Sequence, residues 1–559
     1  MPIMPRPIDV PLPPPPLKKS TQMHGGVAAN RVRGEGPQAS GYSQAGASTT
    51  RRALRGFTAR SGSPNEDIHW NNATLRQRGR MLYMSTPVAA SAINTNRTKV
   101  VGTGLTLKST VYREILGISP EAAKEWQWKA EAEFALWASN KKNCDAIGMN
   151  NFEGLQQLAL KAWLTTGDVF ALIKRYDPTP GNPYSLRLHL IEADRISTPD
   201  QFKGSGLHIR LTDGENQANG NKIFDGVEVD GNGMIVAYHI RSNYPGQITA
   251  DKPEWIRVEA YGELTGLPNI LHIMDSERPD QYRGVTYLAP VIEPLLQLRR
   301  YTESELTAAH IQSCLSAWIL TGTDQSVIPI NEVGAGDIIG GGIPTENPDG
   351  ISGSPNEYEM GPGTVLHLAE GEDVKFSNPN IPTAGFEHFV RTVCRTIGAG
   401  LEIPYDVLMK EFNASYSASR AALLEAWEGF RMRRKWFVDD FCQPVYEIWL
   451  AEAVARGRIK APGFFDDPLI RDAWSDARWI GPAPGVLDPT REAKAAIMNV
   501  DRGFKTHEQI TRELGGGDWY DNVEQLEKEN QLLREAGGGT YMATLADWDS
   551  QDDQETEDK

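Results

Sequence analysis

The sequence predicts an α+β protein built from several parts. Up to about residue 280, helical and strand patterns alternate along the chain, which is typical of helices packed on sheets. Beyond that point the apolar spacing is mainly helical, and two segments are long enough for extended helices. The 559 residues also exceed the size at which a single core stops growing, roughly 250–300 residues. We therefore expect several domains or an extended subunit.

The α+β part is expected at residues 65–280. Ser119 and Pro120 predict the start of a helix, because a capping hydroxyl is followed by proline at the first helical position. The residues Asp230-Gly231-Asn232-Gly233 predict a hairpin turn within 227–240, because they tolerate positive φ. The other elements predicted here are an apolar helix face formed by Trp126, Ala130, Phe134 and Trp137, a second helix at 152–164, and strands at 169–173, 186–190, 255–261 and 270–274.

Longer helices are predicted in the second half of the chain. One is expected over 287–320, with two prolines in its first turns, where a missing donor costs least. The longest candidate runs from Ser419 to Arg456 and ends at Gly457 as a C-terminal cap. A kink is expected in it at Pro444. Further predictions are loops in the Gly/Pro-rich segment 321–364, strands at 364–368 and 373–376, and helices at 386–397, 490–502 and 522–536.

The two ends differ in composition from the middle. Residues 1–60 are rich in Pro, Gly and Ser and hold nine Lys or Arg against two acids, which predicts a disordered basic arm. The last twenty residues, from Thr540, hold seven acids and one Lys, which predicts a disordered acidic tail. The chain as a whole has a net charge of -16. A protein that coats nucleic acid needs many cations at the phosphates, so this charge argues against that class, but it leaves open a channel that lets DNA pass.

Several classes of site are not indicated by the sequence. The four cysteines are far apart and form no CxxC pair, so buried thiols are expected rather than a disulfide frame or a zinc site. No apolar run is long enough for a membrane span, and the N-terminus lacks the apolar region of a signal peptide, which predicts an intracellular protein. The motifs HExxH, GxSxG and GxxxxGK[ST] do not occur. We predict no catalytic, cofactor-binding or metal-binding residues.

Four stretches, taken together and in order, carry a family resemblance. They are Arg278–Val285 with Leu288-Ala289-Pro290, Gly400–Leu408, Ser415–Glu425 with its Ser-Tyr-Ser run at a helix start, and Leu487–Glu492 with the Gly503 and Glu513 regions. With residues 66–107, they make the chain resemble the lambda-type phage portal proteins over about residues 65–535. Arg491, where lysine is common in the family, and the extra Gly516-Gly517 are minor departures.

The resemblance implies a ring of identical subunits, usually twelve, at one capsid vertex. Double-stranded DNA would pass through it during packaging and ejection, without sequence specificity. The implied partners are the terminase, the major capsid and scaffolding proteins, and the head-completion or tail adaptor proteins. The expected location is the virion, with the host cytoplasm during assembly, and no cofactor, membrane or catalytic centre is implied. The implied parts are a wing (65–280), a stem helix (285–320), a clip (321–382), a second stem helix (384–398), a tunnel loop (399–418), a long wing helix (419–457) and a C-terminal wing or crown region (458–539).

Two sets of residues are candidates for contact with DNA. The resemblance gives the tunnel-loop residues Lys410, Glu411, Phe412, Asn413, Ser415 and Tyr416. The densest basic cluster, Arg431, Arg433, Arg434 and Lys435, is either a positive ring at the DNA or a set of salt bridges to neighbouring helices or subunits, of which the salt bridges are favoured. Two other functional classes stay open at this point. One is a nucleic-acid or cell-wall processing enzyme, and the other is a different structural ring or adaptor of the head–tail junction.

Overall fold

The structure is a computed structural model. It describes residues 47–48, 51–54, 56–57, 61–203, 213–247, 252–314, 318–321, 372–375, 385–412, 416–484, 489–515 and 519–535. The chain divides into two units, residues 1–61 and residues 62–559. In the first unit, Arg52–Leu54 form a 3-10 turn. Most of the predicted arm (1–60) and clip (321–382), and all of the predicted tail (540–559), lie outside the described residues.

The second unit begins with a series of helices. A π-helical turn (Asn65–His69) continues into α1 (Trp70–Ser85) and is followed by α2 (Pro87–Val100), β1 (Thr106–Ser109), α3 (Arg113–Leu116), α4 (Pro120–Ala138), α5 (Lys141–Cys144) and α6 (Phe152–Thr166). The predicted start of α4 is confirmed, because the Ser119 hydroxyl accepts a hydrogen bond from the Ala122 N–H at 3.2 Å. On the predicted face of α4, Phe134 and Trp137 are buried.

Two antiparallel sheets follow. The first has the order β3-β2-β9, formed by Leu186–Glu192, Asp168–Arg175 and Ile270–Met274. The second has the order β4-β5-β6-β7-β8, formed by Asp213–Asn216, Asn221–Phe224, Val227–Val229, Ile235–Arg241 and Trp255–Glu259. The predicted hairpin joins β6 to β7, and Gly233 takes the expected positive φ of 88°. Two 3-10 turns, Ala193–Arg195 and Asp200–Phe202, lie between the sheets in sequence.

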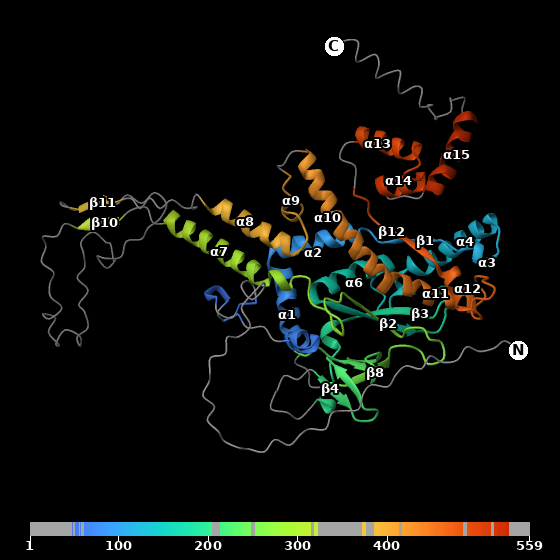
Figure 1. Ribbon diagram of the computed structural model, residues 1–559, viewed down its shortest axis with the longest axis horizontal. Coiled ribbons are helices and arrows are strands. Elements are labelled where there is room, and N and C mark those ends of the chain that lie inside the picture. The colour runs from blue at the N-terminus through green and yellow to red at the C-terminus, as the bar shows by residue number, and fades with distance from the viewer. Residues whose placement is uncertain are drawn as a thin grey trace, which may run out of the picture. The chain divides into compact units, whose positions relative to one another are not determined.

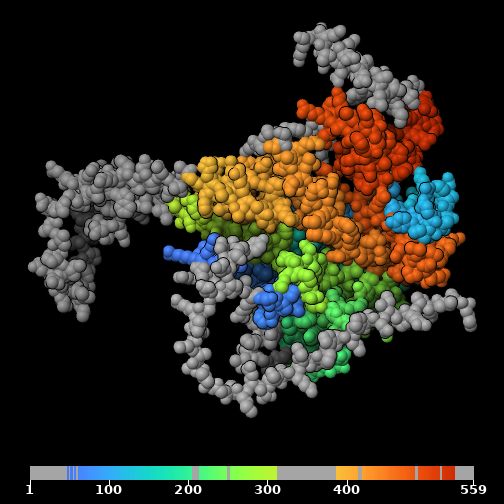
Figure 2. All heavy atoms as spheres, viewed as in Figure 1, coloured from blue at the N-terminus to red at the C-terminus, as the bar shows by residue number. Residues whose placement is uncertain are grey.

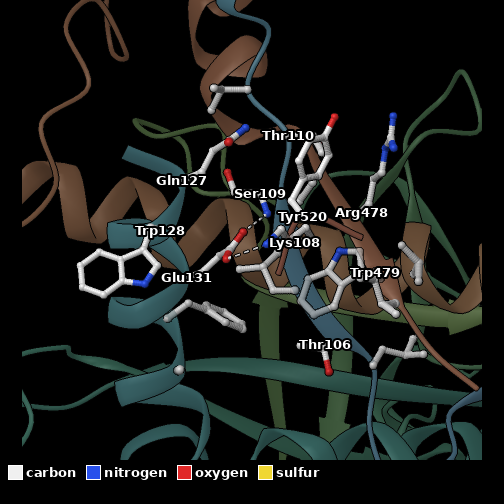
Figure 3. Close-up of a pocket in the computed structure, with 18 of the residues that line it drawn as sticks. Thr106, Lys108, Ser109, Thr110, Gln127, Trp128, Glu131, Arg478, Trp479 and Tyr520 are labelled. Carbon is white, nitrogen blue, oxygen red and sulfur yellow. Dashed lines mark hydrogen bonds and ion pairs between the residues drawn. The ribbon is translucent and has the colours of Figure 1, made fainter. Parts of the chain in front are cut away.

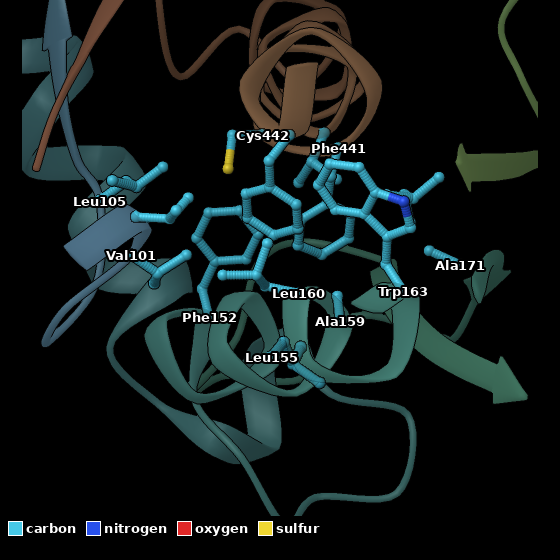
Figure 4. Packing of buried hydrophobic residues seen from close by; sticks show 14 of the residues in the cluster. Val101, Leu105, Phe152, Leu155, Ala159, Leu160, Trp163, Ala171, Phe441 and Cys442 are labelled. Carbon is cyan, nitrogen blue, oxygen red and sulfur yellow. The ribbon is translucent and has the colours of Figure 1, made fainter. Parts of the chain in front are cut away.

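Two apolar cores hold these layers together. A small core lies between the two sheets, where Phe170 of β2 packs with Val227 and Tyr238 of the second sheet. The main core lies on α6. There Phe152 stacks on Phe441 at 5.7 Å, with Cys442 beside it (Figure 4). Figure 1 shows α10 and α11 on one side of α6, and the five-stranded sheet on the other side of β2 and β3.

Two helices run side by side away from this core (Figure 1). They are α7 (Ile292–Cys314), preceded by a 3-10 turn (Ala289–Val291), and α8 (Phe386–Gly400). The ring of Tyr301 on α7 stacks on Phe386 of α8 at 5.6 Å. The predicted helix 287–320 was wrong at both ends. At its start, the α-helix begins only at Ile292, after the 3-10 turn, and at its end Trp318–Thr321 form strand β10, paired with β11 (Glu372–Lys375). Aromatic and β-branched residues favour a strand there, and its partner is too distant in sequence for local spacing to reveal.

The longest predicted helix is interrupted. It consists of α10 (Tyr416–Phe437), a π-helical turn (Val438–Cys442) and α11 (Gln443–Ala455). The π turn ends two residues before Pro444, which has no N–H to continue the ladder of hydrogen bonds. Gly457 has a φ of 70° just after α11, which confirms the predicted C-terminal cap.

The C-terminal part contains α12 (Pro468–Ser475), β12 (Ala477–Ile480), α13 (Pro489–Asp501), α14 (His507–Leu514) and α15 (Trp519–Glu535). The two helices predicted at 490–502 and 522–536 are confirmed as α13 and α15. Strand β12 pairs with β1, so that Leu107 lies opposite Trp479, a pairing that the sequence did not predict. Within the described ranges, no helix is both long and apolar enough to cross a membrane.

Candidate functional site

A buried arginine anchors the segment between β9 and α7. We call residues 275–291 the strap. The Arg283 side chain is fully buried, and its Nε donates to Asp168 Oδ2 at 2.6 Å. Its Nη1 lies 2.8 Å from Asp225 Oδ2, and its Nη2 donates to the Ala193 carbonyl at 2.9 Å. Arg76 of α1 reaches the same Asp225 oxygen at 3.0 Å. The strap, α1 and both sheets therefore meet at one ion-pair network.

This network fixes the charge states of its members. Burial alone would raise the pKa of Asp168, but the guanidinium groups of Arg283 and Arg76 outweigh it and hold that pKa far below its usual range. Burial also lowers the pKa of His272, whose ring stacks on Phe170 at 4.2 Å. Asp168 is thus ionised and held between two permanent cations, while the neighbouring imidazole is kept neutral.

The glycine after this arginine lets two backbones touch. A Cβ at Gly284 would lie 1.9 Å from the carbonyl oxygen of Gly167, so only glycine fits. Gly167 itself has a φ of 97°, the conformation that favours glycine. The Arg-Gly pair in the first of the four family-like stretches therefore locks the strap onto the end of α6 and the start of β2. The sequence picked out this stretch by resemblance and gave no indication of its role.

A second junction lies where α2, α10 and the strap meet the residues that follow α8. Arg433 of α10 is 5% exposed, and its Nη2 lies 2.8 Å from Glu402 Oε2. Its guanidinium sits over the ring of Tyr287 at 4.8 Å and donates to Asn96 Oδ1 at 3.4 Å. The Tyr287 hydroxyl in turn donates to the Leu401 carbonyl. We call this set the loop-root junction, because it ties the strap, α2 and α10 to the residues that follow α8.

Part of the predicted tunnel loop (399–418) is folded, and its placement in a tunnel stays a prediction. Leu401, Ile403, Val407 and Leu408 are buried, and a short helix α9 (Tyr405–Met409) packs against α2, α8 and α10. Local spacing did not reveal α9, because its five residues gain their stability from these contacts rather than from helix propensity.

The remaining loop candidates begin where α9 ends. Lys410 has a φ of 58° and is exposed, and Phe412 is 57% exposed. Glu411 accepts from the Tyr405 hydroxyl at 2.9 Å and lies 3.3 Å from Arg391 Nη2. Asn413 and Ser415 lie outside the described residues, and Tyr416 is the first residue of α10.

The four residues of the predicted basic cluster do not form one surface. Arg433 belongs to the loop-root junction. Arg434 donates to the carbonyls of Lys99, Val100 and Pro482 at 2.7–2.8 Å, and burial lowers its pKa to about 10. Arg431 and Lys435 are exposed and pair with Glu428 at 3.2 Å and Asp439 at 2.6 Å. All four cations therefore have partners within this chain, and only Arg431 and Lys435 are exposed.

Two of the family-like stretches meet in space. Arg420, in the stretch Ser415–Glu425, forms an ion pair with Glu492, in the stretch Leu487–Glu492. The carboxylate side chain of Glu492 is only 9% exposed. This contact links α13 to α10. As with Arg283, a residue noticed through the resemblance serves to hold two distant parts of the chain together.

The structure also has one large groove. It has a volume of about 1440 Å³ and is lined mainly by residues of β1, α4, α10, β12, α14 and the start of α15 (Figure 3). We call it the α4–α14 groove. Inside it, Glu131 of α4 points toward Lys108 of β1, at 3.6 Å. Figure 2 shows the cyan α3–α4 region and the red C-terminal helices next to each other on this face. No group of acids, histidines and cysteines suited to a metal ion occurs in the parts of the chain that the structure describes.

Comparisons with known proteins give a consistent family. The family model described as phage portal protein, lambda family, matches residues 50–434. Portal protein B of Escherichia phage lambda is 24% identical over 498 residues, covering 87% of this chain and 88% of its own. The portal protein of Escherichia phage N15 is 23% identical over 498 residues, covering 87% and 89%. A probable portal protein of Halomonas phage phiHAP-1 is 23% identical, covering 83% and 82%.

Among solved structures, a chain in the neck of a native gene transfer agent particle, computed with C12 symmetry, aligns with a TM-score of 0.39 and 12% identity. The alignment covers 80% of this chain and 94% of that chain. A chain in the virion of the native particle aligns with a TM-score of 0.36 and 13% identity, covering 79% and 92%.

Proposed function

Because the chain belongs to the lambda family of phage portal proteins, we propose that it forms the ring through which double-stranded DNA enters and leaves the capsid. The observation that carries this proposal is the family match over residues 50–434. The role is structural: the chain is a portal protein of the head–tail connector. Its place is the portal vertex of the virion, with assembly in the host cytoplasm. A ring of twelve copies is part of the proposal.

The partners follow from that role. The clip region would receive the terminase during packaging and the head-completion or adaptor proteins afterwards. The major capsid and scaffolding proteins would surround the ring. The chain carries a net charge of -16, so a lumen lined by its acids would repel phosphates and let DNA slide without being held. The chemistry of packaging would stay with the terminase.

Contact with DNA is proposed at residues 410–415, a narrower segment than the sequence predicted. The loop-root junction and α9 hold the start of this segment rigidly, so that Lys410 and Phe412 leave the fold from a fixed point. Glu411 is engaged by Arg391 and Tyr405, so that among the described residues 410–412 the Phe412 ring and the Lys410 side chain are the exposed ones. We expect the contact to be mainly steric, because a single exposed cation per copy is a weak electrostatic grip.

The experiment compares two variants in phage that depend on a plasmid copy of this protein. Deletion of 411–415 should leave ring yield unchanged but lower the amount of DNA packaged or retained, and Lys410→Ala should do much less. Ring yield is read by light scattering and negative-stain microscopy, and packaged DNA by nuclease protection. Normal packaging by the deletion variant would remove this segment from the DNA channel. A purified protein that stays monomeric at micromolar concentration would overturn the portal proposal itself.

A further inference from the structure

The α4–α14 groove is basic in an acidic chain. Eight Lys or Arg and five Asp or Glu line it, whereas the whole chain has a net charge of -16. Four of these acids pair with cations of the groove: Glu131 with Lys108 at 3.6 Å, Asp439 with Lys435 at 2.6 Å, Glu524 with Lys124 at 3.5 Å, and Glu508 with both Arg478 and Arg512 at 2.8 and 2.7 Å. Only Glu508 among them is shared by two cations, and the lining as a whole keeps three more lysines and arginines than acids. A surplus of this kind attracts a negatively charged occupant.

Exposed aromatic side chains border the same groove. Trp128 on α4 is 71% exposed, and Tyr520 on α15 is 56% exposed. A smaller hollow of about 500 Å³ shares Arg431, Arg434 and Arg512 with the groove and ends at Phe504, which is 77% exposed. Large aromatic groups beside cations suit an occupant that carries both acids and large apolar side chains, more than one that offers phosphates alone.

The C-terminal segment of this chain has that composition. Tyr541, Leu545 and Trp548 are spaced by four and three, which puts them on one face if the segment is helical. Seven acids stand between Asp547 and Asp558. The apolar face and the acidic end are therefore adjacent in sequence, as the aromatics and cations are adjacent in the groove.

The segment can also reach the groove. Tyr520 and Glu524 of α15 line it, and α15 ends at Glu535. From Glu524 to Glu535 the helix rises about 17 Å, at 1.5 Å per residue. Residues 536–540 contain three successive glycines and can span about 17 Å when extended. The chain can thus turn after α15 and bring residue 541 back to the level of Glu524.

We propose that residues 541–559 dock in the α4–α14 groove of the same chain, with the apolar face on the aromatic side chains and the acids against the lysines and arginines. The docked tail would cover a basic surface that would otherwise bind DNA or acidic proteins. This inference does not depend on the portal role, because it concerns the folding of one chain onto itself.

Carbodiimide cross-linking of the purified full-length protein tests it. Acids of 547–558 should join the groove lysines Lys108, Lys124 and Lys435 in the band that runs as a single chain on a denaturing gel. The control is Lys222, an exposed lysine on β5 outside the groove, which should give at least fivefold less product. Raising the salt from 50 to 500 mM should lower the groove products at least fivefold, because the attraction is screened.

Two variants in the tail separate the apolar face from the charge. Leu545→Ser with Trp548→Ser should lower the groove cross-links at least fivefold, and Met542→Ser, which lies off that face, should change them less than twofold. The groove variant Arg478→Glu with Arg512→Glu should also lower the groove cross-links at least fivefold. The control variant Lys222→Glu should leave them unchanged. The tail variants keep the test decisive if the groove variant fails to fold.

Three results would overturn the proposal. The first is cross-linking to Lys222 as strong as to the groove lysines. The second is cross-links found only between different chains, which would make a second copy the occupant. The third is displacement of the tail by an equimolar 20-base-pair duplex, with duplex binding lost in the groove variant, which would make the groove a DNA site.

Discussion

Replacing Arg283 by methionine should destabilise the protein strongly. Methionine keeps most of the volume but removes the donors to Asp168, Asp225 and the backbone carbonyls that Arg283 bonds. Asp168 is fully buried, and its remaining cation, Arg76, is 4.0 Å away. Removing one partner of a buried pair leaves an uncompensated charge and costs about 3–5 kcal/mol. We expect a loss of unfolding free energy in that range at pH 7.

The loss should shrink as the pH falls. In the native protein the pKa of Asp168 is held far below its usual value, so its contribution to stability is present above about pH 4 and is lost as the pH falls toward the folded pKa. In Arg283→Met the same burial is no longer offset, so the pKa of Asp168 rises and the folded variant takes up a proton between pH 7 and pH 4. The variant therefore gains stability between pH 7 and pH 4, a window in which the Asp168 contribution to the native protein is still intact.

Guanidinium unfolding followed by tryptophan fluorescence at pH 7, 5.5 and 4 measures both effects. Arg299→Met is the control, because Arg299 pairs with Glu303 one turn away at the surface of α7 and should cost about 0.5 kcal/mol or less. Adding Asp168→Asn to Arg283→Met should restore part of the stability. The reasoning is refuted if Arg283→Met costs less than about 1 kcal/mol, or if its gap to the native protein stays constant or widens toward pH 4.

Two further predictions concern the strap and the loop root. Gly284→Ala should abolish soluble protein or lower the melting temperature sharply, since its Cβ would lie 1.9 Å from a carbonyl oxygen, whereas Gly231→Ala, with open space around it, should melt like the native chain. Arg433→Met should loosen the root of the 410–415 segment and speed trypsin cleavage after Lys410 at least threefold. The exposed Arg431→Met should leave that cleavage rate unchanged, and equal rates for the two variants would argue against the loop-root junction as the anchor.

Local signals in the sequence determined much of the element order. Ser119 with Pro120 started α4, the Asp-Gly-Asn-Gly turn joined β6 to β7, and Gly457 ended α11, because each depends on backbone geometry within a few residues. The family could also be identified from the sequence, because several short stretches resemble those of the lambda family and follow the same order. The spacing of apolar residues placed Phe134 and Trp137 correctly in the core.

The tertiary structure alone decided what the polar residues do. Arg433 and Arg434 stand in one basic run, yet one pairs with Glu402 and the other with backbone carbonyls that include Val100, more than 300 positions away. Strands β1 and β12 likewise pair across most of the chain. The spacing of apolar residues shows which face of a helix or strand is buried, because each buried position on that face requires an apolar side chain. The same spacing does not show which donor bonds to which distant acceptor, because that pairing depends on how whole helices and strands pack together.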